Sequence, residues 1–155
     1  MWTNFVSKVS LFVMMIAPCV GLPIVNAEGV PLNWTSPTRA RLNSVFMVNS
    51  DDGWAVGKRG TTIHWNGTEW SNVTSPTKRN LKSVFMVSSS DGWAVGEWGR
   101  IIHWDGTEWS NVTPHLFGYY LSSVFMVNSN DGWAVGWWEG WGEEYSIGTE
   151  LNGAM

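Results

Sequence analysis

Cysteine and charge are both scarce in this chain of 155 residues. There is one cysteine, and charged residues make up only 14% of the sequence. Hydrophobic residues make up 44%, which excludes an intrinsically disordered chain. The abundant residues are tryptophan, with 13 copies, and glycine, with 17. This composition is typical of short strands, tight turns and aromatic packing rather than of helices, and the length suits one modest domain.

The first 27 residues differ from the rest. Lys8 is the only charge before Glu28, and a nearly continuous apolar run covers residues 9–25. The run ends in Val25-Asn26-Ala27, which matches a signal peptidase site, so we predict a secretory signal peptide over 1–27 and a secreted or cell-surface protein. Two prolines and the shortness of the run argue against a retained membrane anchor.

The cysteine, Cys19, lies inside this predicted signal peptide. It follows a proline, where a lipidation motif needs a small residue such as glycine or alanine, so we do not expect it to carry a lipid. After cleavage the mature chain would contain no cysteine. Disulfide bonds and thiol chemistry would then be excluded.

The rest of the chain is an internal repeat of about 40 residues. One unit covers 42–80, the next covers 81–120, and a partial third covers 121–136. Between the first two units, 25 of the first 33 positions are identical. Trp54, Trp93 and Trp133 mark the repeat, with spacings of 39 and 40 residues.

Each unit divides into four short strands, which in the first unit are residues 44–48, 54–56, 61–65 and 69–73. Asn66-Gly67 between the last two is a strong hairpin signal. Four antiparallel strands in about 40 residues form one propeller blade. We therefore predict an all-β fold, an incomplete β-propeller of about two and a half four-stranded antiparallel blades. A helical solenoid is excluded because glycines and turn pairs interrupt every stretch of helical length.

The motif SVFMV…DGWAVG…HW-[ND]-GTEW, over residues 33–136, resembles the repeat of photosystem II assembly factors of the Ycf48/HCF136 type and of the wider BNR/Asp-box propellers. Together with the predicted signal peptide, the resemblance implies an exported, non-catalytic binding or assembly scaffold. One alternative is a glycan-binding or glycan-processing, sialidase-like Asp-box propeller. Another is a truncated gene product without independent function.

We predict neither an enzyme nor a cofactor or metal site. The arginines lie in turns, and no tyrosine and glutamate pair recurs as hydrolysis of a sialidase substrate would require. His64 and His103 are one repeat apart, which indicates a structural position. The acidic residues that precede glycine in the first turn of each unit are interpreted as turn residues rather than calcium ligands; they are Asp51, Asp52, Asp91 and Asp131.

Charges are sorted between the two ends of the predicted sheets. One end carries acidic residues, namely Asp51, Asp52, Glu69, Asp91, Asp105, Glu108 and Asp131. The other end carries basic residues, namely Arg39, Arg41, Lys58, Arg59, Lys78, Arg79 and Arg100, with Lys82 nearby and Glu97 as the exception. The basic end predicts an anionic partner, either a protein segment or a cell-surface polymer. Export argues against nucleic acid.

Tryptophans that recur in every unit are predicted to pack between blades. Trp98, Trp137 and Trp138 depart from the repeat and are candidates for stacking on a ligand. Four sequons offer possible N-glycosylation sites, at Asn33, Asn66, Asn72 and Asn111. Because the terminal blades would leave unpaired sheet edges, self-association is also predicted.

Residues 137–155 fit no strand of the repeat and are predicted to be a poorly packed tail. Codons for 147–155 can be chosen so that a reading frame two nucleotides further on encodes Trp-Asn-Gly-Thr-Glu-Trp-Ser-Asn, the sequence of 65–72. This agreement predicts a frameshift shortly after Gly136, so that the chain is a fragment of a longer propeller.

Overall fold

The computed structural model describes residues 36–113, 119–140 and 143–151. All described residues belong to one compact unit, Thr35–Met155. The predicted signal peptide and Asn33 lie outside the described residues. In the described ranges, no helix is long and apolar enough to span a membrane.

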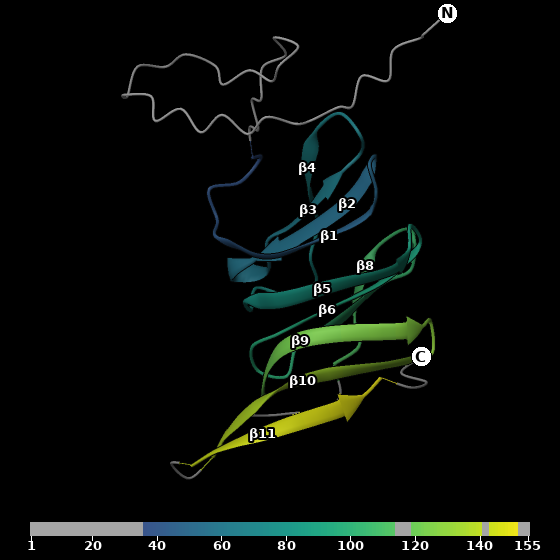
Figure 1. Ribbon diagram of the computed structural model, residues 1–155. Helices are drawn as coiled ribbons and strands as arrows, with labels where there is room; N and C mark the ends of the chain where they lie inside the picture. Colours follow the sequence, from purple (N-terminus) through teal and green to yellow (C-terminus); the bar gives the residue numbers. More distant parts are fainter. Residues whose placement is uncertain (1–35, 114–118, 141–142, 152–155) are drawn as a thin grey trace, which may run out of the picture. The chain divides into compact units, whose positions relative to one another are not determined.

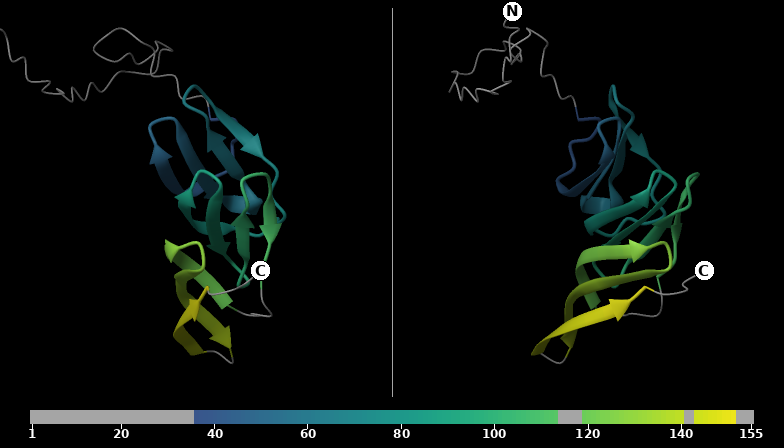
Figure 2. Two further views of the ribbon diagram at one scale, coloured as in Figure 1. Left: turned by 90° about the vertical axis from the view of Figure 1, so that its right-hand side faces the viewer. Right: turned by 45° about the vertical axis from the view of Figure 1, so that its right-hand side comes forward.

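The described residues form three antiparallel sheets, which confirms the predicted all-β incomplete propeller (Figures 1 and 2). Sheet 1 has the order β1-β2-β3-β4, sheet 2 the order β5-β6-β7-β8, and sheet 3 the order β9-β10-β11. The strands are β1 Leu42–Asn49, β2 Asp52–Gly57, β3 Thr62–Trp65, β4 Trp70–Val73, β5 Leu81–Ser88, β6 Asp91–Gly96, β7 Ile101–Trp104, β8 Trp109–Asn111, β9 Tyr119–Asn128, β10 Asp131–Gly140 and β11 Glu143–Glu150. A single 3-10 turn, η1 (Lys58–Gly60), joins β2 to β3.

The two glycines of each DGWAVG motif allow close contacts that recur from sheet to sheet. A Cβ on Gly53 would collide with the Met47 side chain, which lies over this glycine. A Cβ on Gly57 would collide with the backbone oxygen of Arg41, where the first strand begins. The corresponding glycines of sheets 2 and 3 have the same neighbours one repeat later. The motif therefore fixes how the first two strands of each sheet approach each other.

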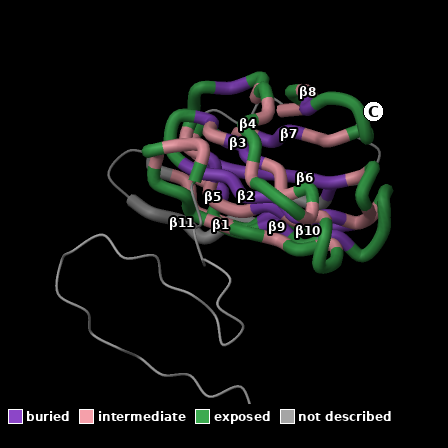
Figure 3. Tube along the Cα trace, turned by 90° about the horizontal axis from the view of Figure 1, so that it is seen from above, coloured by how far each residue is buried: buried purple, intermediate pink, exposed green. Residues whose placement is uncertain are grey.

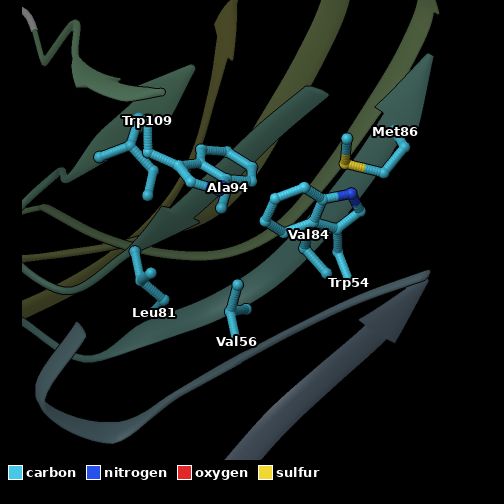
Figure 4. Packing of buried hydrophobic residues seen from close by; sticks show 8 residues of the cluster. Trp54, Val56, Leu81, Val84, Met86, Ala94 and Trp109 are labelled. Atoms are coloured by element: carbon cyan, nitrogen blue, oxygen red, sulfur yellow. The ribbon is translucent and has the colours of Figure 1, made fainter. Parts of the chain in front are cut away.

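Each sheet has two different faces. We call one the tryptophan face; in sheet 1 it carries Phe46, Val48, Trp54 and Val56. We call the other the methionine face; in sheet 2 it carries Leu81, Val84, Met86, Ala94, Ile102, Trp104 and Trp109. These two faces pack together as one core, in which Trp54 lies against residues of sheet 2 (Figure 4). Burial of these apolar side chains is the main stabilising contribution in such a small fold.

The same pairing recurs between sheets 2 and 3. Trp93 and Val95 of sheet 2 pack against the methionine face of sheet 3, which includes Leu121, Val124 and Met126. Figure 3 shows that buried residues are concentrated in strands such as β2 and β6, while exposed residues lie at the turns and also along β1 and β9. Repetition of one face pair holds the three sheets together. Trp54 and Trp93 pack between sheets as predicted, whereas Trp133 is exposed.

Beyond Gly136 the structure differs from the poorly packed tail predicted for 137–155. β10 continues to Gly140, and β11 pairs with it in one unbroken register from Trp133↔Glu150 to Gly140↔Glu143. Tyr145, Ile147 and Thr149 alternate with other residues, which is a strand pattern with a period of two. Leu151 is buried in the second core. The segment therefore forms a hairpin, and the frameshift stays a prediction.

Candidate partner-binding surface

The connections at one end of the sheets bring the predicted basic residues together. The Lys58 backbone N–H donates to the Arg41 carbonyl at 2.8 Å, and the Arg59 N–H donates to Asn80 Oδ1 at 2.9 Å. These bonds tie the turn after β2 to the segments that precede β1 and β5. We call this surface the basic end; its exposed cations are Arg39, Arg41, Lys58, Arg59, Lys78 and Arg79.

Two charged residues at this end are already engaged. Arg100 Nη1 donates to Asn111 Oδ1 at 2.8 Å and to Thr113 Oγ1 at 3.3 Å, so it connects β7 to the end of β8. These contacts give Arg100 a structural role, and its predicted contact with a partner stays a prediction. Glu97, the acidic exception, pairs with Lys82 at 2.8 Å.

Glu97 also accepts a hydrogen bond from Asn80 Nδ2 at 2.8 Å. Burial by itself would raise the pKa of Glu97, but the hydrogen bonds from Lys82 and Asn80 and the positive charge of Lys82 and Lys58 outweigh it and lower that pKa. The carboxylate is therefore charged and locally neutralised. The basic end keeps its positive character.

An aromatic row lies beside these cations. The Arg79 guanidinium lies 5.0 Å from the Trp98 ring centroid, which is a cation–π distance. The centroids of Trp98 and Tyr120 are 6.2 Å apart, and Tyr120 stacks on Trp137 at 5.2 Å and an interplanar angle of 7°. The structure thus joins two predicted stacking residues, Trp98 and Trp137, through a tyrosine. We call these four residues the Arg79–Trp137 row.

Trp138, the third predicted stacking residue, lies apart from this row. It follows Trp137 in β10, so the two side chains project to opposite sides of the strand. Its ring centroid is 6.5 Å from that of Tyr119. Sequence reasoning missed Tyr120. A signal was present, because Tyr119-Tyr120 replaces the Arg79-Asn80 that ends the preceding repeat unit.

Trp98 is held in an unusual backbone conformation. Its φ is 61°, close to the 60° of Arg59 at the same turn position in sheet 1. Non-glycine residues rarely adopt this left-handed region. The Gly99 N–H donates to the Tyr119 carbonyl at 2.6 Å and fixes the turn. Trp98 remains 45% exposed, so the turn presents an indole where sheet 1 presents a guanidinium.

The opposite, acidic end is occupied by structural contacts. His64 Nε2 and Asp52 Oδ1 are 2.9 Å apart, and the His64 ring lies 4.4 Å from that of Trp54. His103 repeats this arrangement with Asp91 at 2.8 Å and with Trp93 at 4.5 Å. No cluster of three or more metal-ligating side chains occurs among the described residues.

Three of the sequon asparagines lie within the described residues, and all are exposed. Asn66 Oδ1 accepts bonds from the backbone N–H groups of Thr68 and Glu69 and so closes the turn between β3 and β4. Asn72 Nδ2 donates to the Pro37 carbonyl at 3.1 Å. Asn111 Oδ1 accepts from Arg100. Each amide therefore has a structural contact, and glycosylation stays a prediction.

Comparisons with known proteins give the fold. No family model matches the chain, and no curated protein matches it. A solved structure described as YCF48 bound to D1 peptide is similar, with a TM-score of 0.57 and 21% identity over 76% of this chain and 39% of that one. YCF48 from Cyanidioschyzon merolae is similar with a TM-score of 0.54 and 20% identity, over 79% of this chain and 40% of that one. The chain has a Ycf48-like propeller fold and spans about two fifths of these structures.

Proposed function

We propose that this chain is an exported, non-catalytic binding or assembly scaffold, and that it binds an extended acidic protein segment at its basic end. The Arg79–Trp137 row, beside the exposed cations of the neighbouring turns, is the observation that carries the proposal. Export rests on the signal peptide predicted from the sequence.

The chemistry of the basic end suits such a segment. Arg59 and Arg79 offer planar guanidinium groups for carboxylates, and Trp98 offers an indole face for an apolar or aromatic side chain. The turns that carry them are held by backbone hydrogen bonds, so little order has to be gained on binding. The acidic residues at the far end would also orient an approaching anion towards the basic end.

The similarity to YCF48 supports a protein segment as the ligand class. One of the similar structures is described as YCF48 bound to D1 peptide. A propeller of this fold can therefore act as a peptide-binding scaffold. The identity of the segment for the present chain is open to experiment.

The proposal can be tested with a fluorescently labelled peptide of repeated Glu-Glu-Tyr and a matched Lys-Lys-Tyr peptide, followed by fluorescence anisotropy. We expect only the acidic peptide to bind, with an affinity that falls as salt rises. Arg59→Glu and Arg79→Glu should each weaken binding by about tenfold, the effect of losing roughly 1.4 kcal/mol.

The matched controls are Glu69→Lys and Glu108→Lys, which change exposed charges at the opposite end. They should leave the affinity nearly unchanged. Equal losses from reversals at both ends would contradict the proposed surface. Tighter binding of a sulfated polysaccharide than of the acidic peptide would favour the anionic cell-surface polymer instead.

The exposed indole of Trp98 also favours a second candidate, glycan binding by stacking on a sugar ring. A neutral oligosaccharide bound through this residue would show little dependence on salt. Its binding would be lost in Trp98→Ala and kept in Arg59→Glu. That pattern separates the two candidates.

A further inference from the structure

The two outermost faces of the described sheets are apolar and exposed. Trp133 is 51% exposed, although its repeat equivalents Trp54 and Trp93 are 1% and 3% exposed. Val45 is 61% exposed, although its equivalent Val84 is 4% exposed. The exposed apolar residues are Leu42, Val45 and Met47 on the methionine face of sheet 1, and Phe125, Val127, Trp133 and Val135 on the tryptophan face of sheet 3.

These two open faces are of opposite kinds. Sheet 1 leaves its methionine face uncovered, and sheet 3 leaves its tryptophan face uncovered. Inside the chain, a tryptophan face always packs against a methionine face, once between sheets 1 and 2 and once between sheets 2 and 3. Two faces of the same kind never meet among the described sheets.

The open methionine face of sheet 1 already has the tryptophan pair that contacts an incoming tryptophan in sheet 2. Trp54 packs against Trp104 and Trp109 of sheet 2, with centroids 4.7 and 5.4 Å away. Trp104 and Trp109 are 5.8 Å apart at 41°. Their equivalents in sheet 1, Trp65 and Trp70, are also 5.8 Å apart, at 42°. The site that receives Trp54 in sheet 2 therefore exists, with the same geometry, on the open face of sheet 1.

A hydrogen bond between neighbouring sheets repeats in the same way. The Val84 N–H donates to Ser44 Oγ, and the Val124 N–H donates to Ser83 Oγ, each at 3.3 Å. The serine that would continue this series is Ser123 of sheet 3, and the N–H that would meet it is that of Val45 in sheet 1. Ser123 is exposed.

We propose that the tryptophan face of sheet 3 and the methionine face of sheet 1 are the two halves of one interface that joins copies of this chain head to tail. Trp133 of one copy lies between Trp65 and Trp70 of the next, and Ser123 Oγ accepts from the Val45 N–H. Each contact joins two different faces, and in a closed pair of copies the two contacts are related by a two-fold axis. Propellers close with about four to eight sheets, so two copies, with three described sheets each, supply a number in that range. This refines the predicted self-association from sheet edges to sheet faces.

Sedimentation of the whole chain and of two variants tests the proposal. Trp133→Asp places a carboxylate on the tryptophan face and Val45→Asp places one on the methionine face. Because both positions are exposed, each variant should fold, which circular dichroism and the unfolding midpoint will check. The wild type should sediment as an assembly of two copies. Each variant should dissociate, with a dissociation constant raised by about thirtyfold or more.

A mixture of the two variants gives the decisive result. Trp133→Asp keeps an intact methionine face and Val45→Asp keeps an intact tryptophan face, so a head-to-tail interface restores a pair only in the mixture. Trp98→Asp is the matched control, since it removes an exposed tryptophan outside both faces and should leave the assembly unchanged. A wild-type chain that sediments as a monomer at every concentration would overturn the proposal. An assembly that Val45→Asp leaves intact would also overturn it. Loss of acidic-peptide binding would not affect this result.

Discussion

The core between sheets 1 and 2 and the outward face of sheet 3 have the same residue types at matching positions. Phe46, Val48, Trp54 and Val56 are covered by sheet 2, whereas Phe125, Val127, Trp133 and Val135 are exposed. The backbone pairing around them is also shared, since Trp54 pairs with Phe46 and Trp133 pairs with Phe125. How much a repeated residue contributes to the free energy of unfolding therefore depends on whether the next sheet covers it. Its place in its own sheet does not decide this.

The largest difference is expected when the central tryptophan is removed. Trp93→Ala should lower the free energy of unfolding by about 3–5 kcal/mol, because it leaves a cavity in a covered core. Trp133→Ala should change it by less than about 1 kcal/mol in dilute, unassociated chain, as an exposed position does. Urea unfolding of both variants measures the difference. Equal losses would show that the face of sheet 3 is covered within the chain.

A smaller difference is expected for the serine hydrogen bonds between sheets. Ser44→Ala removes the acceptor of the Val84 N–H and should cost about 1 kcal/mol of unfolding free energy. Ser123→Ala should leave the unfolding of the dilute chain unchanged and weaken association instead. Unfolding of each variant at low and high protein concentration separates the two effects. A loss for Ser123→Ala at low concentration would contradict the comparison.

The smallest difference concerns the turns between the third and fourth strands of sheets 1 and 2. Hydrogen bonds from the Thr107 side chain and from the backbone of Glu108 and Thr107 lower the pKa of Asp105 to about 2. A carboxyl with a lowered folded pKa adds stability above its unfolded pKa, and this contribution is lost as pH falls from about 4 to about 2. Asn66 closes the equivalent turn without titrating.

Asp105→Asn should therefore lose less stability than the wild type between about pH 5 and about pH 2, and Asn66→Asp should lose more. Unfolding midpoints measured across this range check the sign. An acid sensitivity that both variants leave unchanged would mean that other carboxyl groups control it.

Much of the fold could be predicted from the sequence, because a repeat specifies the same sheet each time. The spacing of Trp54 and Trp93 and the Asn66-Gly67 turn gave the four strands of sheets 1 and 2. The hairpin of β10 and β11 could not be found in this way, since it has no equivalent in the other units. Its signal was the alternation of Tyr145, Ile147 and Thr149 rather than the repeat.

The candidate site was only partly predictable. The sorting of charges located the basic end, because strand order alone decides which turns share an end. The contacts of Arg100 with Asn111 and Thr113 could not be predicted, because they depend on the register of β7 and β8. Tyr120 was missed because its role depends on two approaches that the repeat does not show. The pairing of β9 with β10 places it against Trp137, and the packing of sheets 2 and 3 places it near Trp98.

The contrast between sheet 3 and the other sheets also bears on the reading frame. The frameshift hypothesis expects the coding sequence, read two nucleotides on from the start of the Ile147 codon, to encode the Trp65–Asn72 hairpin sequence. Sequencing of the gene decides this. Any other reading there would remove the main support for a truncated longer propeller.

The most direct test of the account follows Trp133 itself. In a chain labelled with 5-fluorotryptophan, the fluorine signals of Trp133, Trp65 and Trp70 are assigned by single substitutions to phenylalanine and recorded as protein concentration rises. The account predicts that these three signals shift together, that the signal of Trp98, which is also exposed, does not shift, and that Val45→Asp abolishes the change. A shift of Trp98 with no shift of Trp133 would contradict it.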